Sequence, residues 1–391
     1  MWNRSGTPIS IIKLNINLRK QCEFFGFSEN PENESILIFH SCSTNRNVDK
    51  DQMDTFGRCN ELHIGNTPRS IMTKGISTRR KNRLPGSLYG NLDPGNNDKL
   101  MISYKRVPSH DYTMWEACGV LFEGEIHFFG GSDYTKQNWI NLTRQHFVIE
   151  TQRKGQQVEM TKKEDLEMGF WVPACSSFEM TSEYFPWFKT NFVVLCFDWY
   201  HKNSCYSFDG TLTHIVDSNY KHFKGALTKY ESNILTVGGW DNQKTELLKI
   251  DENKNFNCSV VEPDFKFTPG NKVYEHSMVT IESSDINEEY VLLTGGYNDR
   301  RDSMGNVFKF NRTWFSFGQL KKPRFSHNSI YWNGAVYVIG GAYREGSKTK
   351  MEIWNIKDSQ NQFKTTENWP ELLWWSKPHL FIVPDSFFPD H

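Results

Sequence analysis

AVYVIGG, residues 335–341, is the stretch of this chain that decides its fold. It is an apolar, strand-forming run that ends in two glycines. The same pattern recurs as EIHFFGG at 125–131, NILTVGG at 233–239 and YVLLTGG at 290–296. The pairs that begin at Gly238, Gly295 and Gly340 follow one another at intervals of 57 and 45 residues. Recurrence at such intervals indicates an array of similar supersecondary units.

The longer interval between Gly130 and Gly238 predicts a degenerate copy. TNFVVLCF, residues 190–197, supplies it, with Cys196-Phe197 in the place of the glycines. Five units are therefore visible, with second strands that end near Gly131, Phe197, Gly239, Gly296 and Gly341. We interpret eight glycines as structural positions of the repeat, where positive φ or a close backbone approach is needed: Gly130, Gly131, Gly238, Gly239, Gly295, Gly296, Gly340 and Gly341.

Each unit is expected to hold four short strands. In the last unit these are 326–332, 335–341, 350–356 and 362–369, and Asn333-Gly334 is a strong hairpin signal between the first two. One such sheet cannot bury both of its faces, so the units must stack. No stretch shows sustained helical periodicity, which predicts an all-β protein.

The last two units resemble the kelch repeat. Phe308 lies six residues before Trp314, and Arg324 and the pair Gly340-Gly341 follow in order. We therefore identify the chain as similar to the kelch-repeat β-propellers, which include the central domain of galactose oxidase. The resemblance covers about residues 115–370 and implies a propeller of four-stranded blades around a channel.

The two ends of the chain suggest how such a ring closes. SILIFHS, residues 35–41, has the form of a second strand, and PHLFIVP, residues 378–384, has the form of a first strand without a successor. We expect the two segments to share one blade, which predicts six four-stranded blades. Residues 1–110 are assigned to a divergent N-terminal region with a basic insertion at 66–110, and residues 111–391 to the propeller blades, closed by a strand near 378–384.

Composition limits the partners and the compartment. The net charge of −1 favours no nucleic acid, and no apolar run approaches the ~20 residues of a membrane span. The opening MWNRSGTPIS lacks the apolar core of a signal peptide. We expect a cytoplasmic protein. The alternative is a secreted one whose upstream part is missing from the sequence, which eight cysteines and five Asn-x-Ser/Thr motifs would also suit.

The cysteines form no CxxC pair and show no zinc spacing. Most lie in apolar strand segments, where a thiol behaves as a small apolar group. We favour buried thiols over disulfides, although Cys196 and Cys205 could face each other across neighbouring strands.

The basic stretch 68–83 and four histidines each admit two interpretations. The stretch carries six Arg and Lys and no acid, and we favour a solvated insertion over a docking arm or nuclear-import signal. His222, His276, His327 and His379 recur near first strands. We favour a structural role in the repeat over a metal site, because no acid accompanies them at fixed spacing.

Topology places the candidate binding surface. The loops after the glycine pairs emerge on one face of a propeller, and they are rich in aromatic residues and Arg, the types that dominate binding hot spots. The predicted partner-binding residues are Tyr134, Trp240, Tyr297, Arg300, Arg301, Arg324, Tyr343 and Arg344.

The chain shows none of the sequence motifs of hydrolases, metalloproteases or phosphate-binding enzymes. We therefore expect a non-enzymatic scaffold, without cofactor, metal or catalytic residues, that binds a partner protein or peptide on this face. Kelch adaptors that it resembles often capture acidic segments. The alternative is an enzyme of the propeller superfamily at the channel mouth, either a copper oxidase similar to galactose oxidase or a sugar-processing activity.

Overall fold

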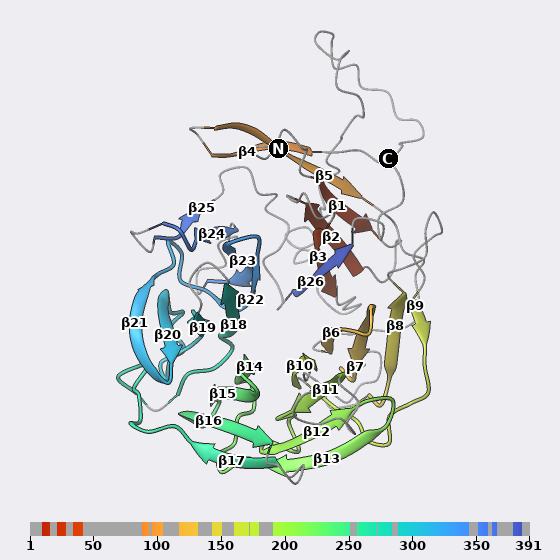
Figure 1. Ribbon diagram of the computed structural model, residues 1–391, viewed down its shortest axis with the longest axis vertical. Coiled ribbons are helices and arrows are strands. Elements are labelled where there is room, and N and C mark those ends of the chain that lie inside the picture. Colours follow the sequence, from red (N-terminus) through yellow and green to blue (C-terminus); the bar gives the residue numbers. More distant parts are fainter. Residues whose placement is uncertain are drawn as a thin grey trace, which may run out of the picture.

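The computed structural model describes sixteen segments of the chain: residues 10–15, 22–28, 34–41, 88–93, 96–104, 117–131, 143–150, 160–171, 173–179, 191–250, 256–270, 272–283, 288–343, 351–358, 362–365 and 378–384. Within them every regular element is a β-strand, and the strands form six sheets arranged around a central axis (Figure 1). The protein is an all-β propeller. None of the described segments contains a helix long and apolar enough to cross a membrane.

Five of the sheets are four-stranded antiparallel blades whose strands follow chain order from the axis outward. Blade 1 comprises β6 (Cys118–Phe122), β7 (Glu125–Phe129), β8 (His146–Glu150) and β9 (Met160–Lys162). Blade 2 comprises β10 (Ala174–Glu179), β11 (Asn191–Cys196), β12 (Ser204–Phe208) and β13 (Leu212–Asp217). Blade 3 comprises β14 (Ala226–Tyr230), β15 (Asn233–Gly239), β16 (Asn242–Ile250) and β17 (Phe256–Val260).

Blade 4 comprises β18 (Ser277–Ser283), β19 (Glu288–Thr294), β20 (Asn306–Asn311) and β21 (Thr313–Gln319). Blade 5 comprises β22 (Phe325–Trp332), β23 (Ala335–Ala342), β24 (Glu352–Asn355) and β25 (Lys364–Thr365). The hairpin expected at Asn333-Gly334 joins β22 to β23, and both of its residues have positive φ.

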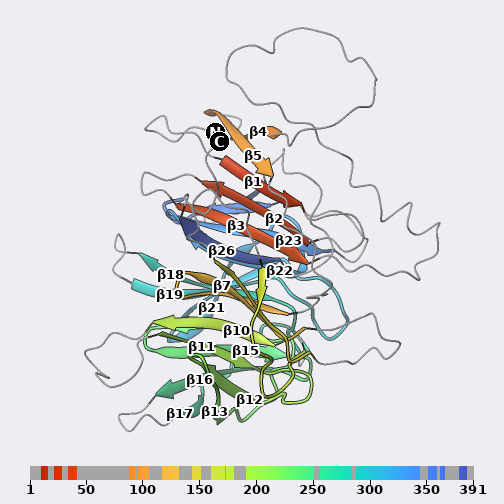
Figure 2. The same ribbon diagram turned by 90° about the vertical axis from the view of Figure 1, so that its right-hand side faces the viewer.

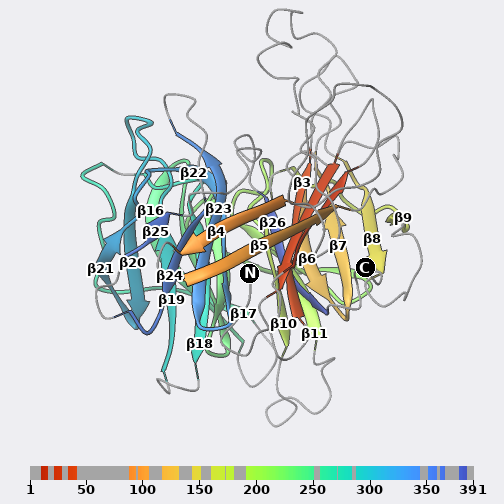
Figure 3. The same cartoon turned by 90° about the horizontal axis from the view of Figure 1, so that it is seen from above.

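The sixth sheet corrects the expectation of six four-stranded blades, because only five sheets have four strands. It has six strands in the order β26 (His379–Pro384), β3 (Glu34–Ser41), β2 (Cys22–Ser28), β1 (Ser10–Asn15), β5 (Asn96–Tyr104) and β4 (Leu88–Asp93). It does not stop at β1, because β1 pairs in parallel with β5 and extends the sheet outward. β4 and β5 pair antiparallel and lie at the outer end of this sheet in Figures 1 and 2, and Figure 3 shows the two strands side by side from above. Part of the segment expected to be a basic insertion thus forms strands, whereas residues 68–83 lie outside the described segments.

The ring closes through β26. This strand pairs antiparallel with β3, with Phe381 opposite Leu37 (Figure 2). It also contacts β22 of blade 5 and β6 of blade 1, so the six innermost strands form an uninterrupted circle. Segments from opposite ends of the chain therefore share one sheet.

The hydrophobic core is divided among the interfaces between blades. One cluster joins Val237 of blade 3 to Leu293 and Trp314 of blade 4, and similar clusters join blades 1 and 2, 2 and 3, and 4 and 5. The indole N–H of Trp314 also donates to the Thr245 hydroxyl of blade 3 at 2.9 Å. Each blade buries its faces only against its neighbours, as stacking of the repeat requires.

The glycine pairs connect consecutive blades. The N–H of the second glycine donates to a carbonyl in the lead-in segment of the next blade, the residues directly before its first strand. The bonds run from Gly131 to Phe170 (2.9 Å), from Gly239 to Val273 (2.8 Å) and from Gly296 to Arg324 (2.8 Å). A Cβ on Gly295, where φ is +56°, would lie 2.5 Å from the Arg324 carbonyl oxygen. Only glycine fits this approach.

In blade 2 the structure shifts the predicted glycine position by one residue. The N–H of Phe197 bonds Ser204 of β12 at 3.1 Å, as the N–H of Gly295 bonds Asn306 of β20 at 3.0 Å. Phe197 also has a φ of +62°. Phe197-Asp198, rather than Cys196-Phe197, therefore replaces the glycine pair.

Candidate binding face

A repeated main-chain bond brings two aromatic residues of each of blades 2, 3 and 4 together at one end of the ring. One lies in the lead-in segment, and the other directly follows the glycine pair or its substitute. The N–H of the second donates to the carbonyl of the first. The pairs are Trp199 with Trp171 (3.2 Å), Trp240 with Phe223 (2.8 Å) and Tyr297 with Tyr274 (2.8 Å).

Ring contacts link these residues in two runs, from Trp171 to Phe223 and from Trp240 to Phe325, and the main-chain bond between Trp240 and Phe223 joins the two runs. Ring centroids lie 5.3 Å apart for Trp171 and Trp199, 4.8 Å for Trp199 and Phe223, 5.1 Å for Trp240 and Tyr274, 5.4 Å for Tyr274 and Tyr297, and 3.8 Å for Tyr297 and Phe325. We call Trp171, Trp199, Phe223, Trp240, Tyr274, Tyr297 and Phe325 the aromatic arc. It spans the lead-in segments and post-glycine loops of blades 2 to 5.

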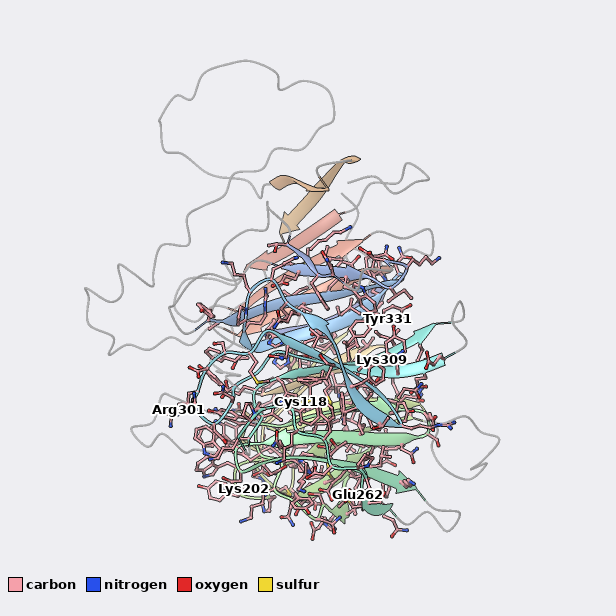
Figure 4. The ribbon with its side chains drawn as sticks, turned by 90° about the vertical axis from the view of Figure 1, so that its left-hand side faces the viewer. Cys118, Lys202, Glu262, Arg301, Lys309 and Tyr331 are labelled. Carbon is pink, nitrogen blue, oxygen red and sulfur yellow. A yellow bond between two sulfur atoms is a disulfide. The ribbon has the colours of Figure 1, made fainter. Side chains whose placement is uncertain are left out.

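Three cations lie over the tryptophans of the aromatic arc. The Lys202 ammonium is 4.8 Å from the Trp199 ring centroid, and Lys224 and Arg301 are 5.4 and 5.8 Å from that of Trp240. Cations at such distances are attracted to the ring face. Figure 4 shows Lys202 and Arg301 at the same side of the propeller, opposite to Lys309 and Tyr331. Trp171, Trp199, Trp240, Tyr297 and Phe325 are half-buried, whereas Phe223 and Tyr274 are buried. The accessible part of the arc therefore consists of five aromatic side chains with cations beside the two tryptophans Trp199 and Trp240.

Glu275 connects blades 3, 4 and 5 beneath this surface. Its carboxylate pairs with the Lys224 ammonium at 2.5 Å and accepts a bond from the Ser326 hydroxyl at 2.5 Å. Burial and the charge of Glu275 raise the pKa of Tyr274 and of Tyr297 above the ordinary value. Both phenols therefore stay neutral at physiological pH and can donate hydrogen bonds.

Seven of the eight predicted face residues fall into three groups. Trp240 and Tyr297 belong to the aromatic arc, Arg301 lies over it, and Arg300 is exposed on the same loop. Tyr343 is half-buried just after β23. Tyr134 and Arg344 lie outside the described residues.

Arg324 is the predicted face residue that the structure places elsewhere. It is fully buried, and its guanidinium pairs with the Glu352 carboxylate at 2.6 Å and donates to the Gly340 carbonyl at 3.1 Å. The side chain is therefore not presented to a partner. The sequence predicts Arg324 on the binding face because it lies between two blades. Its acid partner Glu352 lies on β24, 28 residues further along the chain, and the ion pair holds the side chain in the interior.

The same slot in blade 3 holds His222, which is also fully buried. Its imidazole contacts the Glu246 carboxylate at 2.7 Å and the Gly238 carbonyl at 2.5 Å. The sequence predicts a structural role for this histidine, and the contacts agree with it. Its acid partner on β16 was not anticipated, since 24 residues separate the two.

The arc residues that sequence reasoning missed do carry a signal. Trp171, Phe223, Tyr274 and Phe325 follow one another at intervals of 52, 51 and 51 residues. These intervals are more regular than those between the glycine pairs, because each one runs from the lead-in segment of one blade to the lead-in segment of the next. Trp199 could have been found as the residue that follows Phe197-Asp198.

The structure also bears on the metal alternative. No group of three or more His, Cys, Asp or Glu side chains that could hold an ion occurs within the described segments. His276 and His327 are fully buried, next to the glycine pairs of blades 4 and 5. His379 of β26 packs against the ring of Phe128.

Comparison with known proteins assigns this chain neither a family nor an activity. No protein-family model matches the chain, and no curated protein matches it. Among solved structures, a fungal copper-bound alcohol oxidase of the AA5 family is 14% identical, with a TM-score of 0.46. The alignment covers 72% of the present chain and 58% of that oxidase, so less than two thirds of the oxidase is matched. At this level the likeness carries no argument about activity.

Proposed function

We propose that this propeller is a non-enzymatic interaction scaffold of the kelch type that binds a partner protein or peptide over the aromatic arc. The supporting observation is the arc itself: seven aromatic residues from four blades, five of them half-buried, in two runs of ring contacts that the main-chain bond between Trp240 and Phe223 joins. Lys202, Lys224 and Arg301 lie over its tryptophans. Aromatic and Arg side chains supply much of the energy of protein interfaces.

The charge of this surface favours a partner segment with acidic residues. Arg300 and Arg301 are exposed and adjacent, and Arg301 is held beside the Trp240 ring. A carboxylate of the partner can pair with a guanidinium while a neighbouring apolar group covers the ring. An acidic peptide is therefore the proposed ligand.

The test uses peptides selected by display on the immobilised wild-type protein and then measured in solution. We expect acidic peptides to be enriched, and Arg300→Glu/Arg301→Glu to weaken their binding at least tenfold without lowering Tm. The matched control is Lys249→Glu/Lys364→Glu, which reverses two exposed lysines of β16 and β25. The control should bind as the wild type does.

Two results would contradict the proposal. One is equal affinity of the wild type and the Arg300→Glu/Arg301→Glu variant. The other is stoichiometric copper in purified protein together with alcohol-dependent hydrogen peroxide formation, which would favour the oxidase alternative.

A further inference from the structure

Two main-chain bonds join each of blades 1, 3 and 4 to the next lead-in segment, and the described part of blade 2 shows one of them. The N–H of His222 donates to the Lys202 carbonyl at 2.8 Å, as that of Arg324 donates to Met304 at 3.0 Å, but the bond from the second glycine position is missing from the described residues.

In blades 1, 3 and 4 the second glycine donates its N–H to the next lead-in segment. Asp198 holds this position in blade 2, and the described residues show no such bond from it to blade 3. Its buried carboxylate instead accepts bonds within its own loop, from the N–H groups of Tyr200 (2.6 Å) and His201 (3.1 Å).

Both disulfides of the described chain involve this same blade. Cys196 and Cys205 are directly opposed on β11 and β12, with Cα atoms 4.2 Å apart, and both are fully buried. They pack among residues of blade 3, including Leu227 and Leu248. The bond thus lies immediately before Phe197-Asp198, where the glycine pair is missing.

The second disulfide ties blade 2 to blade 1. It joins Cys118 of β6 to Cys175 of β10, the innermost strands of the two blades, across 57 residues with Cα atoms 6.0 Å apart. This Cα separation is usual for a disulfide. One disulfide therefore links blade 2 to blade 1, and the other links two neighbouring strands, β11 and β12, within blade 2.

Cys258 provides an internal contrast. It forms no disulfide, and its Sγ lies 3.1 Å from the Glu246 carboxylate, to which the thiol donates. Burial and this carboxylate raise the pKa of Cys258 to about 12. A thiol in this state is a poor nucleophile, so it does not compete in disulfide exchange.

We propose that the two disulfides stabilise blade 2 in place of the glycine bond, and that the chain therefore acquires its native fold in an oxidising compartment. Each bond forms when two thiols lose two protons and two electrons. The electrons reduce the disulfide of an oxidised dithiol partner by thiol–disulfide exchange. Such bonds persist in secretory and extracellular compartments and are rare in the cytosol. This inference favours the secreted alternative over the expectation of a cytoplasmic protein and does not depend on the proposed function.

The first experiment maps the cysteines of protein made through a secretory host. The protein is denatured without reductant, alkylated with N-ethylmaleimide, digested and analysed by mass spectrometry. We expect one linked pair of peptides containing Cys118 and Cys175, another containing Cys196 and Cys205, and an alkylated Cys258. Natively folded protein with all of these cysteines alkylated would overturn the proposal.

The second experiment measures where the bonds act. We expect a reductant to lower Tm by at least about 5 °C, as loss of a loop-closing bond predicts. Hydrogen exchange should rise more in β10 to β13 than in β22 to β25, because blade 5 has its glycines and no disulfide. An unchanged Tm with uniform exchange would contradict a role in blade 2.

Cys118→Ala/Cys175→Ala and Cys196→Ala/Cys205→Ala separate the two bonds, and Cys258→Ala is the matched control. Each double variant should lose part of the sensitivity to reductant, whereas the control should keep all of it. If a double variant fails to fold, the wild type with and without reductant still decides the matter. Protein from a reducing cytosol with the same Tm and no linked peptides would also refute the proposal.

Discussion

The guanidinium of Arg324 and the carboxylate of Glu352 lie 2.6 Å apart, and both side chains are fully buried. The equivalent slot in blade 3 holds His222 and Glu246. In blade 2 it holds Phe170 and Tyr206, with ring centroids 5.6 Å apart, and in blade 4 Val273 and Phe308 share one apolar cluster. In blades 2 to 5, therefore, the lead-in residue at this slot packs with a residue of the third strand, either as base and acid or within an apolar cluster.

This equivalence predicts that replacing both Arg324 and Glu352 by apolar residues preserves most of the stability, whereas removing only one of the two charges does not. Arg324→Val should lower the free energy of unfolding by about 3 to 5 kcal/mol, because Glu352 is left buried without its counterion. Arg324→Val/Glu352→Phe copies the blade 4 pair and should recover much of that loss. The remainder reflects the N–H groups of Lys321 and Lys322, which bond Glu352. Denaturant unfolding measures both, and a double variant less stable than the single one would contradict the equivalence.

The carboxylate of Glu246 should make stability sensitive to acid. Burial raises its pKa, but His222, Asn219 and Cys258 outweigh burial and lower it to about 2. The stabilisation is fully present above the ordinary value of 4.5 and is lost as pH falls from 4.5 towards 2. Glu246→Gln should cost about 3 kcal/mol at pH 7 and little at pH 2.

The control for Glu246 is Glu282→Gln. Glu282 is 57% exposed and pairs with Lys229 on the surface, so it should change stability by less than about 0.5 kcal/mol at any pH. Unfolding curves between pH 2 and 7 that coincide for the two variants would refute this role of Glu246.

His127 and His146 should make the stability of the fold depend on pH in a range above that of Glu246. Their rings stack between blades 1 and 2 beside Phe208, with Nδ1 of His127 2.9 Å from Nε2 of His146 and Glu125 3.6 Å away. Burial, followed by the charges of His146 and Lys163, lowers the pKa of His127 to about 3. Burial and the charge of Lys163 lower the pKa of His146 to about 4.

The unfolded chain therefore binds more protons than the folded chain below pH 6.5, and stability falls from there towards pH 3. At pH 5 the loss should be about 2 to 4 kcal/mol relative to pH 7. His127→Leu/His146→Leu should flatten this part of the profile of Tm against pH. A variant as acid-sensitive as the wild type would show that other groups are responsible.

Gly295 should tolerate no side chain, because a Cβ there would clash with a neighbouring blade. Gly334 has no such neighbour and serves as the comparison. Both have positive φ, +56° and +75°, but a Cβ has nothing within 4 Å at Gly334. Gly334→Ala should cost about 1 kcal/mol from backbone strain alone. Gly295→Ala should cost at least about 2 kcal/mol more, because its Cβ would press on the Arg324 carbonyl. Equal losses would mean that strain, not blade contact, selects glycine.

Several features follow from local pattern. The strands that end in Gly130-Gly131 and Gly340-Gly341 and the hairpin at Asn333-Gly334 occur where the sequence predicts them. Glycine at positive φ and alternation within short strands are properties of a few adjacent residues, so they can be recognised without the fold. The pairing of 379–384 with 34–39 could be inferred as well, because both segments lacked partners.

By itself, the sequence determined that this chain is a repeated all-β structure, and where the second strands of five blades lie. Only the tertiary structure decided that Glu352 draws Arg324 into the interior, that blade 2 carries two disulfides, and that the sixth sheet continues to β5 and β4. It also joined the aromatic residues of four blades into one arc. These features depend on which residues meet across tens of positions or between blades, and such contacts arise from packing that no local spacing encodes.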